Sequence, residues 1–193
     1  MYFELNIQVK GEKLTYDEFY EFCCQNNNLK FERTSLGQII FFIPRGGETG
    51  RINSEITSRL QIWSEQTGLG ETFDSSTGFK LPNEATRSPD VAWIKKERWD
   101  NLLPEEKKKF PPLCPDFILE IRSENDTISE IHRKMIEYLE NGTQLAWIID
   151  PIDKKVHIYR PEKSIEIINT FDEKLNGEEV LPGFIFDLSI LKI

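Results

Sequence analysis

The sequence predicts a single domain of the α+β class. Its 193 residues are enough for one domain with a sizeable core and few for two. Segments with apolar residues at helical spacing alternate with short apolar runs of strand character. One such run, Leu145 to Ile149, is wholly apolar, which is typical of a strand covered on both faces. We therefore expect helices and strands to share one core.

Capping residues and apolar spacing predict three helices. A capping box at 15–18 begins a helix that ends at about residue 25. A second helix carries apolar residues every three or four positions and ends at Gly68, where a C-terminal cap belongs. A third follows the turn at 124–126 and has Gly142 as its stop.

Short apolar runs bounded by turn residues predict the strands. Besides two strands that carry acids, described below, they are expected at 31–34, 38–43, 71–74, 78–81, 145–149, 156–160, 165–168 and 184–188. The stretch 104–115 contains four prolines, so we expect it to be irregular and outside the core. The domain then divides into an N-terminal helix and β-hairpin (1–50), a catalytic core (51–150) and a C-terminal β extension (151–193).

Composition excludes several classes of protein. No uninterrupted apolar stretch approaches the roughly 18 residues of a membrane span, 39–43 being among the longest. Residues 1–13 lack the basic and apolar regions of an export signal. Cys23 and Cys24 are adjacent and Cys114 stands alone, which fits neither a disulfide framework nor a zinc site. We expect a cytoplasmic protein with reduced thiols and no membrane partner.

The net charge of -9 weighs against a nucleic-acid substrate. Affinity for a polyanion comes mostly from Lys and Arg contacts to phosphates, which an acidic protein must concentrate locally. Two basic clusters, at 95–98 and 107–109, either make such contacts or belong to solvated loops. A bound metal ion would offset part of the acidity at the site itself.

Two acids lie on strongly apolar strands. Asp90 opens one strand and Glu120 lies late in the next. A buried carboxylate is costly unless it is paired, hydrogen-bonded or bound to a cation. Two of them in one small domain point to a shared task, and binding a divalent cation is the simplest. The structural alternatives are a turn at Asp90 and a buried salt bridge from Glu120 to Arg122 or Lys134.

Strand geometry decides which acids can cooperate. If the two strands pair antiparallel, the start of one meets the end of the other, so Asp90 and Glu120 come close. Asp116 lies four residues before Glu120, about 13 Å away at strand rise. Ligands of one cation approach it to about 2 Å, so Asp116 cannot readily share a metal with Glu120. A plain Pro-Asp turn is the alternative for Asp116.

Lys134 can be placed on the third helix by angle. It falls just outside an apolar stripe formed by Ile128, Ile131, Met135, Tyr138 and Leu139. From there its stem can lie on the core and carry the ammonium group to the rim of the sheet, although a surface lysine would do the same. His132 and His157 have no partner at nucleophile or zinc spacing, so we expect both to be structural. No phosphate-binding loop or nucleophile motif is present.

Seven segments together carry a resemblance to a known family. They read GGETGRINSEI, FDSSTGFKLP, RSPDVAWI, CPDFILEIRS, KMIEYLENG, LAWIIDP and VLPGF, and they cover most of the chain. The chain resembles the Uma-type restriction endonucleases, a branch of the PD-(D/E)xK nuclease superfamily. The resemblance implies a restriction-endonuclease-like core in which a mixed central β-sheet is flanked by helices. It also implies a homodimer that cleaves DNA with Mg²⁺, for which Mn²⁺ can substitute.

The resemblance also assigns residues. Asp90 matches the motif aspartate and Glu120 the glutamate of E-x-K, so these two would hold the metal. Arg122 stands where E-x-K has lysine, and a guanidinium stays protonated and cannot act as a base. Lys134 matches a lysine that the family carries on the following helix, and Glu32 matches a further acid.

The sequence therefore favours a Mg²⁺-dependent DNA endonuclease. Asp90 and Glu120 would bind the metal with help from a backbone carbonyl at residue 121. Lys134 would position the attacking water or screen developing charge, and Glu32 would complete the site or orient that lysine. Arg122, as a phosphate contact, and Asp116 would serve substrate binding.

Two other functions remain open. The first is a module that binds nucleic acid or protein without cutting, with a vestigial nuclease site; the net charge of -9 favours it. The second is a small-molecule phosphodiesterase, whose substrate an acidic surface would tolerate better than DNA.

Overall fold

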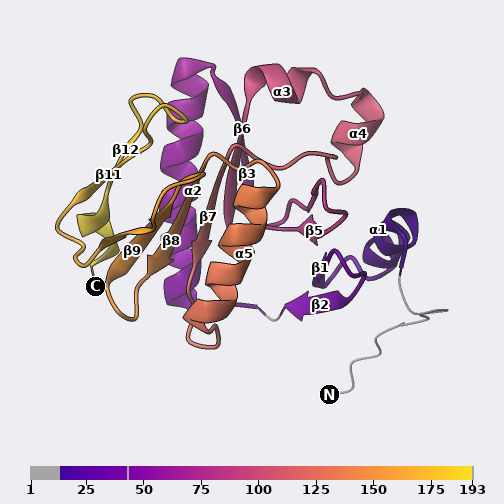
Figure 1. The fold of residues 1–193 in the computed structure, drawn as a ribbon, viewed down its shortest axis with the longest axis horizontal. Helices are drawn as coiled ribbons and strands as arrows, with labels where there is room; N and C mark the ends of the chain where they lie inside the picture. Colours follow the sequence, from indigo (N-terminus) through magenta and orange to yellow (C-terminus); the bar gives the residue numbers. More distant parts are fainter. Residues whose placement is uncertain (1–13, 43, 193) are drawn as a thin grey trace.

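A mixed six-stranded sheet forms the centre of the molecule in the computed structural model, which describes residues 14–42 and 44–192 (Figure 1). Its strand order is β10-β9-β8-β7-β6-β3, and only the β7–β8 pair is parallel. The strands are β3 (Gly70–Asp74), β6 (Val91–Lys95), β7 (Phe117–Ile121), β8 (Leu145–Asp150), β9 (Lys155–Tyr159) and β10 (Glu166–Ile168). The expected α+β class with a mixed sheet is confirmed.

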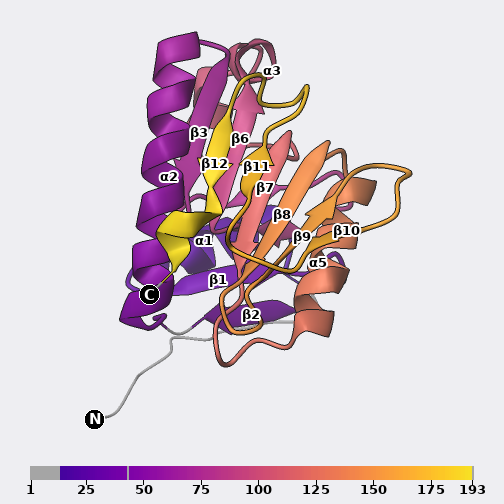
Figure 2. The same cartoon turned by 90° about the vertical axis from the view of Figure 1, so that its left-hand side faces the viewer.

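Two helices cover opposite faces of this sheet (Figures 1 and 2). Helix α2 (Gly47–Thr67) packs on the face that receives Phe117, Leu119 and Ile121 of β7. Helix α5 (Ile128–Glu140) packs on the other face, which receives Ile118. Because side chains alternate along a strand, Glu120 points to the α5 side. The sheet thus aims this acid at the helix that carries the candidate lysine.

Helix α5 is the crossover between parallel strands β7 and β8. The Thr127 hydroxyl caps its first turn by accepting the Glu130 N–H at 3.4 Å. Its C-terminal end is followed by Gly142 at φ +115°, a conformation that side chains rarely adopt. The crossover therefore begins and ends close to the positions that the sequence predicted.

A second, smaller sheet lies beside the central one, with strand order β2-β1-β5-β4. It is built from β1 (Lys30–Arg33), β2 (Ile39–Phe42), β4 (Phe79–Lys80) and β5 (Thr86–Arg87). Helix α1 (Tyr16–Gln25) packs on it through a cluster that includes Phe19 and Phe31. This sheet carries two buried charged residues, Glu32 and Arg87, to the edge of the candidate site.

The C-terminal segment thickens the core on the α2 side (Figure 2). It contains β11 (Lys174–Asn176), β12 (Ile185–Asp187) and a 3-10 helix at Leu188–Leu191. Phe186 and Leu188 from this segment pack in the same cluster as Ile56 of α2. No helix among the described residues is long and apolar enough to cross a membrane.

The main departure from expectation is the proline-rich stretch. It contains a short helix, α4 (Pro104–Lys108), preceded by α3 (Lys96–Asp100). Proline is well suited to a first helical position, and the Glu106 carboxylate accepts the Leu103 N–H at 2.8 Å. We expected this stretch to lie outside the core, and that expectation is wrong. Cys114 is buried against the α5 side of the sheet. The expectation about residues 1–13 lies outside the described residues, as does position 43 of the second hairpin strand.

Gly70 of β3 provides a test of the close packing between β3 and β6. An added methyl group there would overlap the Ile94 carbonyl oxygen and the Trp93 ring, whereas nothing lies within 4 Å of Gly50 in α2. Gly70→Ala should lower the free energy of unfolding by about 1–3 kcal/mol. Gly50→Ala should raise it by about 0.5–1 kcal/mol, because alanine favours a helix. Urea denaturation measures both, and equal effects would contradict the packing described.

Candidate active site

Pairing of β6 with β7 brings the two predicted metal ligands together. Val91 pairs with Leu119 in this antiparallel ladder, so Asp90 lies beside Glu120. The Ile121 N–H donates to Oδ2 of Asp90 at 2.8 Å, which holds the aspartate against the end of β7. The exposed fractions of Asp90 and Glu120 are 2% and 4%. The predicted juxtaposition of these buried acids is confirmed.

Lys134 joins Glu120 to a third acid. Its Nζ lies 2.6 Å from Oε1 of Glu120 and 2.8 Å from Oε1 of Glu32. The lysine comes from α5, the glutamates from the central and the smaller sheet, so one ammonium group links three elements. The position of Lys134 on the helix predicted that its ammonium group could extend to the rim of the sheet, but not which residue it would contact. In the structure it contacts Glu120.

Glu32 is the anchor of this arrangement. Besides Lys134, its carboxylate accepts a hydrogen bond from the Ser88 N–H at 2.9 Å and one from Nη1 of Arg87 at 3.1 Å. Nε of Arg87 in turn donates to Glu137 at 2.6 Å. Of the two roles expected for Glu32, the contacts support orientation of Lys134.

The surroundings shift the pKa values of these groups in opposite directions. Burial raises the pKa of Glu120 to about 7, with the charges of Asp90 and Glu32 acting in the same direction and Lys134 opposing them. Burial also penalises the charged forms of Glu32 and Lys134, but their ion pairs outweigh it. The pKa of Glu32 therefore lies below its ordinary value, and that of Lys134 above its own. Lys134 is protonated at neutral pH.

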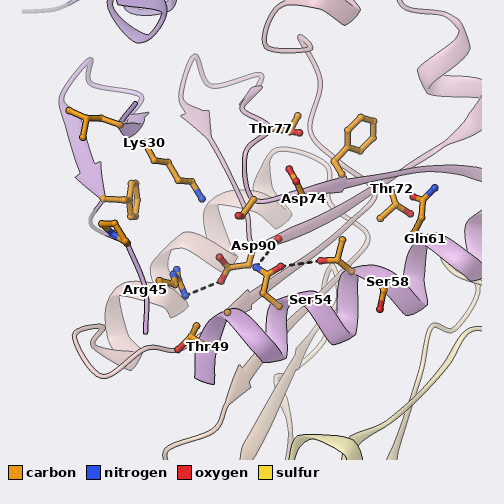
Figure 3. Close-up of a pocket in the computed structure, with 18 of the residues that line it drawn as sticks. Lys30, Arg45, Thr49, Ser54, Ser58, Gln61, Thr72, Asp74, Thr77 and Asp90 are labelled. Atoms are coloured by element: carbon orange, nitrogen blue, oxygen red, sulfur yellow. Dashed lines mark hydrogen bonds and ion pairs between the residues drawn. The ribbon is translucent and has the colours of Figure 1, made fainter. Parts of the chain in front are cut away.

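Two hollows meet at this site. The acid hollow, of about 580 Å³, is lined by Glu32, Glu120 and Lys134 among others. The α2 groove, of about 970 Å³, has Asp90 at its floor and the polar face of α2 along one wall (Figure 3). That wall presents neutral hydrogen-bonding side chains: Thr49, Asn53, Ser54, Thr57, Ser58 and Gln61.

Arg45 stands where the two hollows meet and lines both of them. Its Nη1 lies 3.0 Å from Oδ2 of Asp90 (Figure 3). The same nitrogen also donates to the Ile121 carbonyl. This residue was not identified from the sequence, where it lies between the expected strand at 38–43 and the second helix. The available signal was a lone cation between an apolar strand and a helix start.

The donor atoms fit a hard divalent cation. Asp90, Glu120 and the Ile121 carbonyl offer only oxygen, which Mg²⁺ prefers. Within the described part of the chain, no group of three or more His, Cys, Asp or Glu is arranged to hold a metal ion. A Mg²⁺ site does not need three such side chains, because one or two carboxylates, together with waters and substrate phosphates, are enough to bind this ion.

Asp116 lies away from both hollows. Its carboxylate accepts a hydrogen bond from the Lys95 N–H of β6 at 2.9 Å and forms an ion pair with Arg98 of α3 at 2.9 Å. These contacts tie the start of β7 to both elements. The rings of His132 and His157 pack against each other at 5.0 Å, and the structural role expected of them stays a prediction. The substrate role of Asp116 stays a prediction.

Arg122 follows β7 and faces other acids. Its Nη1 lies 2.7 Å from Asp150 and 3.0 Å from Asp153. Arg122 lines neither the acid hollow nor the α2 groove. Glu120 is thus paired with Lys134 rather than with its neighbour Arg122. The phosphate contact expected of Arg122 stays a prediction, and it would require release from these two aspartates.

Replacement of Glu32 tests its role as anchor. Glu32→Gln leaves Lys134 and Arg87 without their shared partner, so the free energy of unfolding at neutral pH should fall by about 3–5 kcal/mol. Glu84→Gln, at an exposed ion pair with Lys80, should cost at most about 1 kcal/mol. Urea denaturation compares the two, and equal losses would contradict the anchor role.

Acid titration gives the same test a second readout. The pKa of Glu32 is lower in the folded than in the unfolded protein, so its contribution is present above its ordinary pKa and is lost as pH falls through the folded value. Stability of the Glu32→Gln variant should therefore fall less steeply with acidification than that of the wild type.

Comparisons with known proteins identify a family and a shared fold. A model of the Uma2 family, described as "Putative restriction endonuclease", matches residues 16–189. A crystal structure of a putative nuclease belonging to DUF820 from Anabaena variabilis ATCC 29413 is similar at TM-score 0.74 and 21% identity. That match covers 92% of this chain and 97% of the other, and it shows a shared fold.

A DrdV–DNA complex matches at TM-score 0.41 and 11% identity, over 62% of this chain and 10% of the other, which is too weak to support an argument. No curated protein matches. The family model spans nearly the whole described chain, including every residue of the site assembled above. This chain belongs to the Uma2 family of restriction-endonuclease-like proteins.

Proposed function

We propose that this protein is a metal-dependent endonuclease that hydrolyses phosphodiester bonds in DNA. The observation that carries the proposal is the buried pair Asp90 and Glu120, with a protonated lysine 2.6 Å from the glutamate. Two acids on adjoining strand ends and a cation beside them are what metal-assisted phosphodiester hydrolysis requires. Membership of a nuclease family supports the same reaction class. We further propose a homodimer, since two sites related by a twofold axis suit cleavage of both strands.

Each residue has a role in this proposal. Asp90, Glu120 and the Ile121 carbonyl would hold Mg²⁺, or Mn²⁺ in its place. When bound, the ion would promote ionisation of the attacking water and stabilise charge on the phosphate. Lys134, being protonated, would act as a fixed positive charge near the reacting phosphate rather than as a base. Glu32 would hold this lysine in position.

The α2 groove is the proposed path of a DNA strand. Hydroxyl and amide side chains along α2 can bond to phosphate and sugar oxygens without carrying charge. Its charged lining consists of Lys30, Arg45, Asp74 and Asp90, two cations and two anions. A divalent cation on Asp90 would make this lining net positive. An acidic protein could then bind DNA at this groove only when metal is present.

A non-cleaving binding module is the second candidate function, and the net charge of -9 favours it. In such a module the network around Lys134 would serve stability alone. The two functions differ in their need for a divalent ion, since only the nuclease requires one.

Glu120→Gln should abolish Mn²⁺ binding while leaving the fold intact, because an amide keeps the shape of the side chain and loses its charge. The control is Glu130→Gln, a change of the same chemistry in the same acid hollow at a residue with no proposed metal contact. Calorimetric titration measures affinity and circular dichroism checks folding. Unchanged Mn²⁺ affinity in the Glu120→Gln variant would overturn the proposed metal site.

Lys134→Ala should reduce single-turnover DNA cleavage by about 10²–10³-fold, the usual cost of removing one group that stabilises transition-state charge. Mn²⁺ and DNA should still bind, because Asp90 and Glu120 remain. Arg133→Ala is the matched control, since Arg133 is the neighbouring cation of α5 and lines the same hollow. Wild-type cleavage by the Lys134→Ala variant would exclude a catalytic role for the lysine.

A further inference from the structure

Arg45 already binds two of the oxygens that the proposed function assigns to the metal. Its guanidinium contacts Oδ2 of Asp90 at 3.0 Å (Figure 3). The same nitrogen, Nη1, donates to the Ile121 carbonyl. A divalent cation and a guanidinium both seek carboxylate and carbonyl oxygen. They cannot occupy the same space between these two atoms.

The position of Arg45 also separates the two acids of the site. Asp90 lines the α2 groove and Glu120 lines the acid hollow, while Arg45 lines both. Its guanidinium therefore stands at the boundary between the two hollows. Removal of the guanidinium from this boundary would connect the α2 groove with the acid hollow.

The charges explain why a cation is needed at Asp90. Glu120 and Glu32 share Lys134, whereas the cation nearest to Asp90 is Arg45. Asp90 is almost fully buried, and a buried carboxylate without a partner is costly. The Arg45 side chain is 27% exposed, so its charged end can move into water once another cation is bound at Asp90.

We propose that Arg45 is the resident cation of the metal site. It neutralises Asp90 in the metal-free protein, and a divalent ion displaces it from Asp90 and from the Ile121 carbonyl. Metal binding and opening of the boundary between the hollows are then one event. This inference rests on the proposed function, because it takes Asp90 as a metal ligand.

The test is a calorimetric titration of Mn²⁺ into the wild type and Arg45→Ala. Without the competing guanidinium, the variant should bind Mn²⁺ about tenfold more tightly or better, the equivalent of one charge-assisted hydrogen bond. Arg51→Ala is the control, since Arg51 is an exposed arginine of α2 whose Nη1 contacts the Ile190 carbonyl at 3.4 Å. It should bind Mn²⁺ as the wild type does.

Thermal unfolding supplies a second readout that does not depend on cleavage. In the absence of metal, Arg45→Ala should unfold at a lower temperature than the wild type, because Asp90 loses its cation. Saturating Mn²⁺ should raise the unfolding temperature more in this variant than in the wild type. Arg45→Gln, which removes the charge but keeps a donor for the Ile121 carbonyl, replaces it if the alanine variant does not fold.

The outcomes separate this inference from the proposed function. If the wild type binds Mn²⁺ clearly and both Arg45 variants bind it equally or more weakly, the ion does not displace Arg45. The proposed metal site would be unaffected by that result. Absence of Mn²⁺ binding in all proteins would overturn the metal site itself. Tighter binding by the variants supports both.

Discussion

The ammonium group of Lys134, held between Glu32 and Glu120, is the interaction on which the site depends. It joins the smaller sheet, the central sheet and α5 at one point. Each of these groups would be costly to bury alone, and together they offset one another. Because one lysine is shared by acids from two different sheets, the relative position of the three elements is coupled to their charge. The fold and the electrostatics of the site are therefore set by the same contacts.

This network also bears on how an acidic protein could act on DNA. Lys134 and Arg87 are committed to Glu32 and its neighbours, and Arg45 to Asp90. Each of the three positive charges is therefore offset by a neighbouring carboxylate. A divalent ion at Asp90 adds positive charge and releases Arg45 at the same time. Under the proposed function, metal would therefore serve to attract the substrate as well as to perform the chemistry. The net charge of -9 would oppose binding of polyanions by the metal-free protein.

The sequence predicted those parts of the site that depend on local periodicity. Asp90 and Glu120 lie on adjoining apolar strands, so antiparallel pairing alone brought them together. The helical angle predicted the reach of Lys134. Glu32 came only through family resemblance, because it lies 102 residues from its partner Lys134 and on a different sheet. No periodicity connects positions so far apart.

Other features escaped prediction for reasons of length or context. Strand β5 has two residues, too few for an alternating pattern, yet it carries Arg87. The burial of Cys114 depends on how the proline-rich stretch folds back on the sheet, which its composition does not encode. Arg45 follows a hairpin in a glycine-containing turn, and its importance comes from the carbonyl and carboxylate it meets across the fold.

The presence of two acids around Lys134, rather than one, has a consequence for the loaded site. Burial by itself lowers the pKa of this lysine, and both Glu120 and Glu32 act to raise it. A cation bound to Glu120 would cancel much of the influence of that glutamate. Glu32, anchored by Arg87 and the Ser88 N–H and placed outside the proposed metal ligands, would continue to hold the lysine in its charged form. Under the proposed function, the distant acid from the smaller sheet would then let Lys134 serve as a fixed charge while metal is bound.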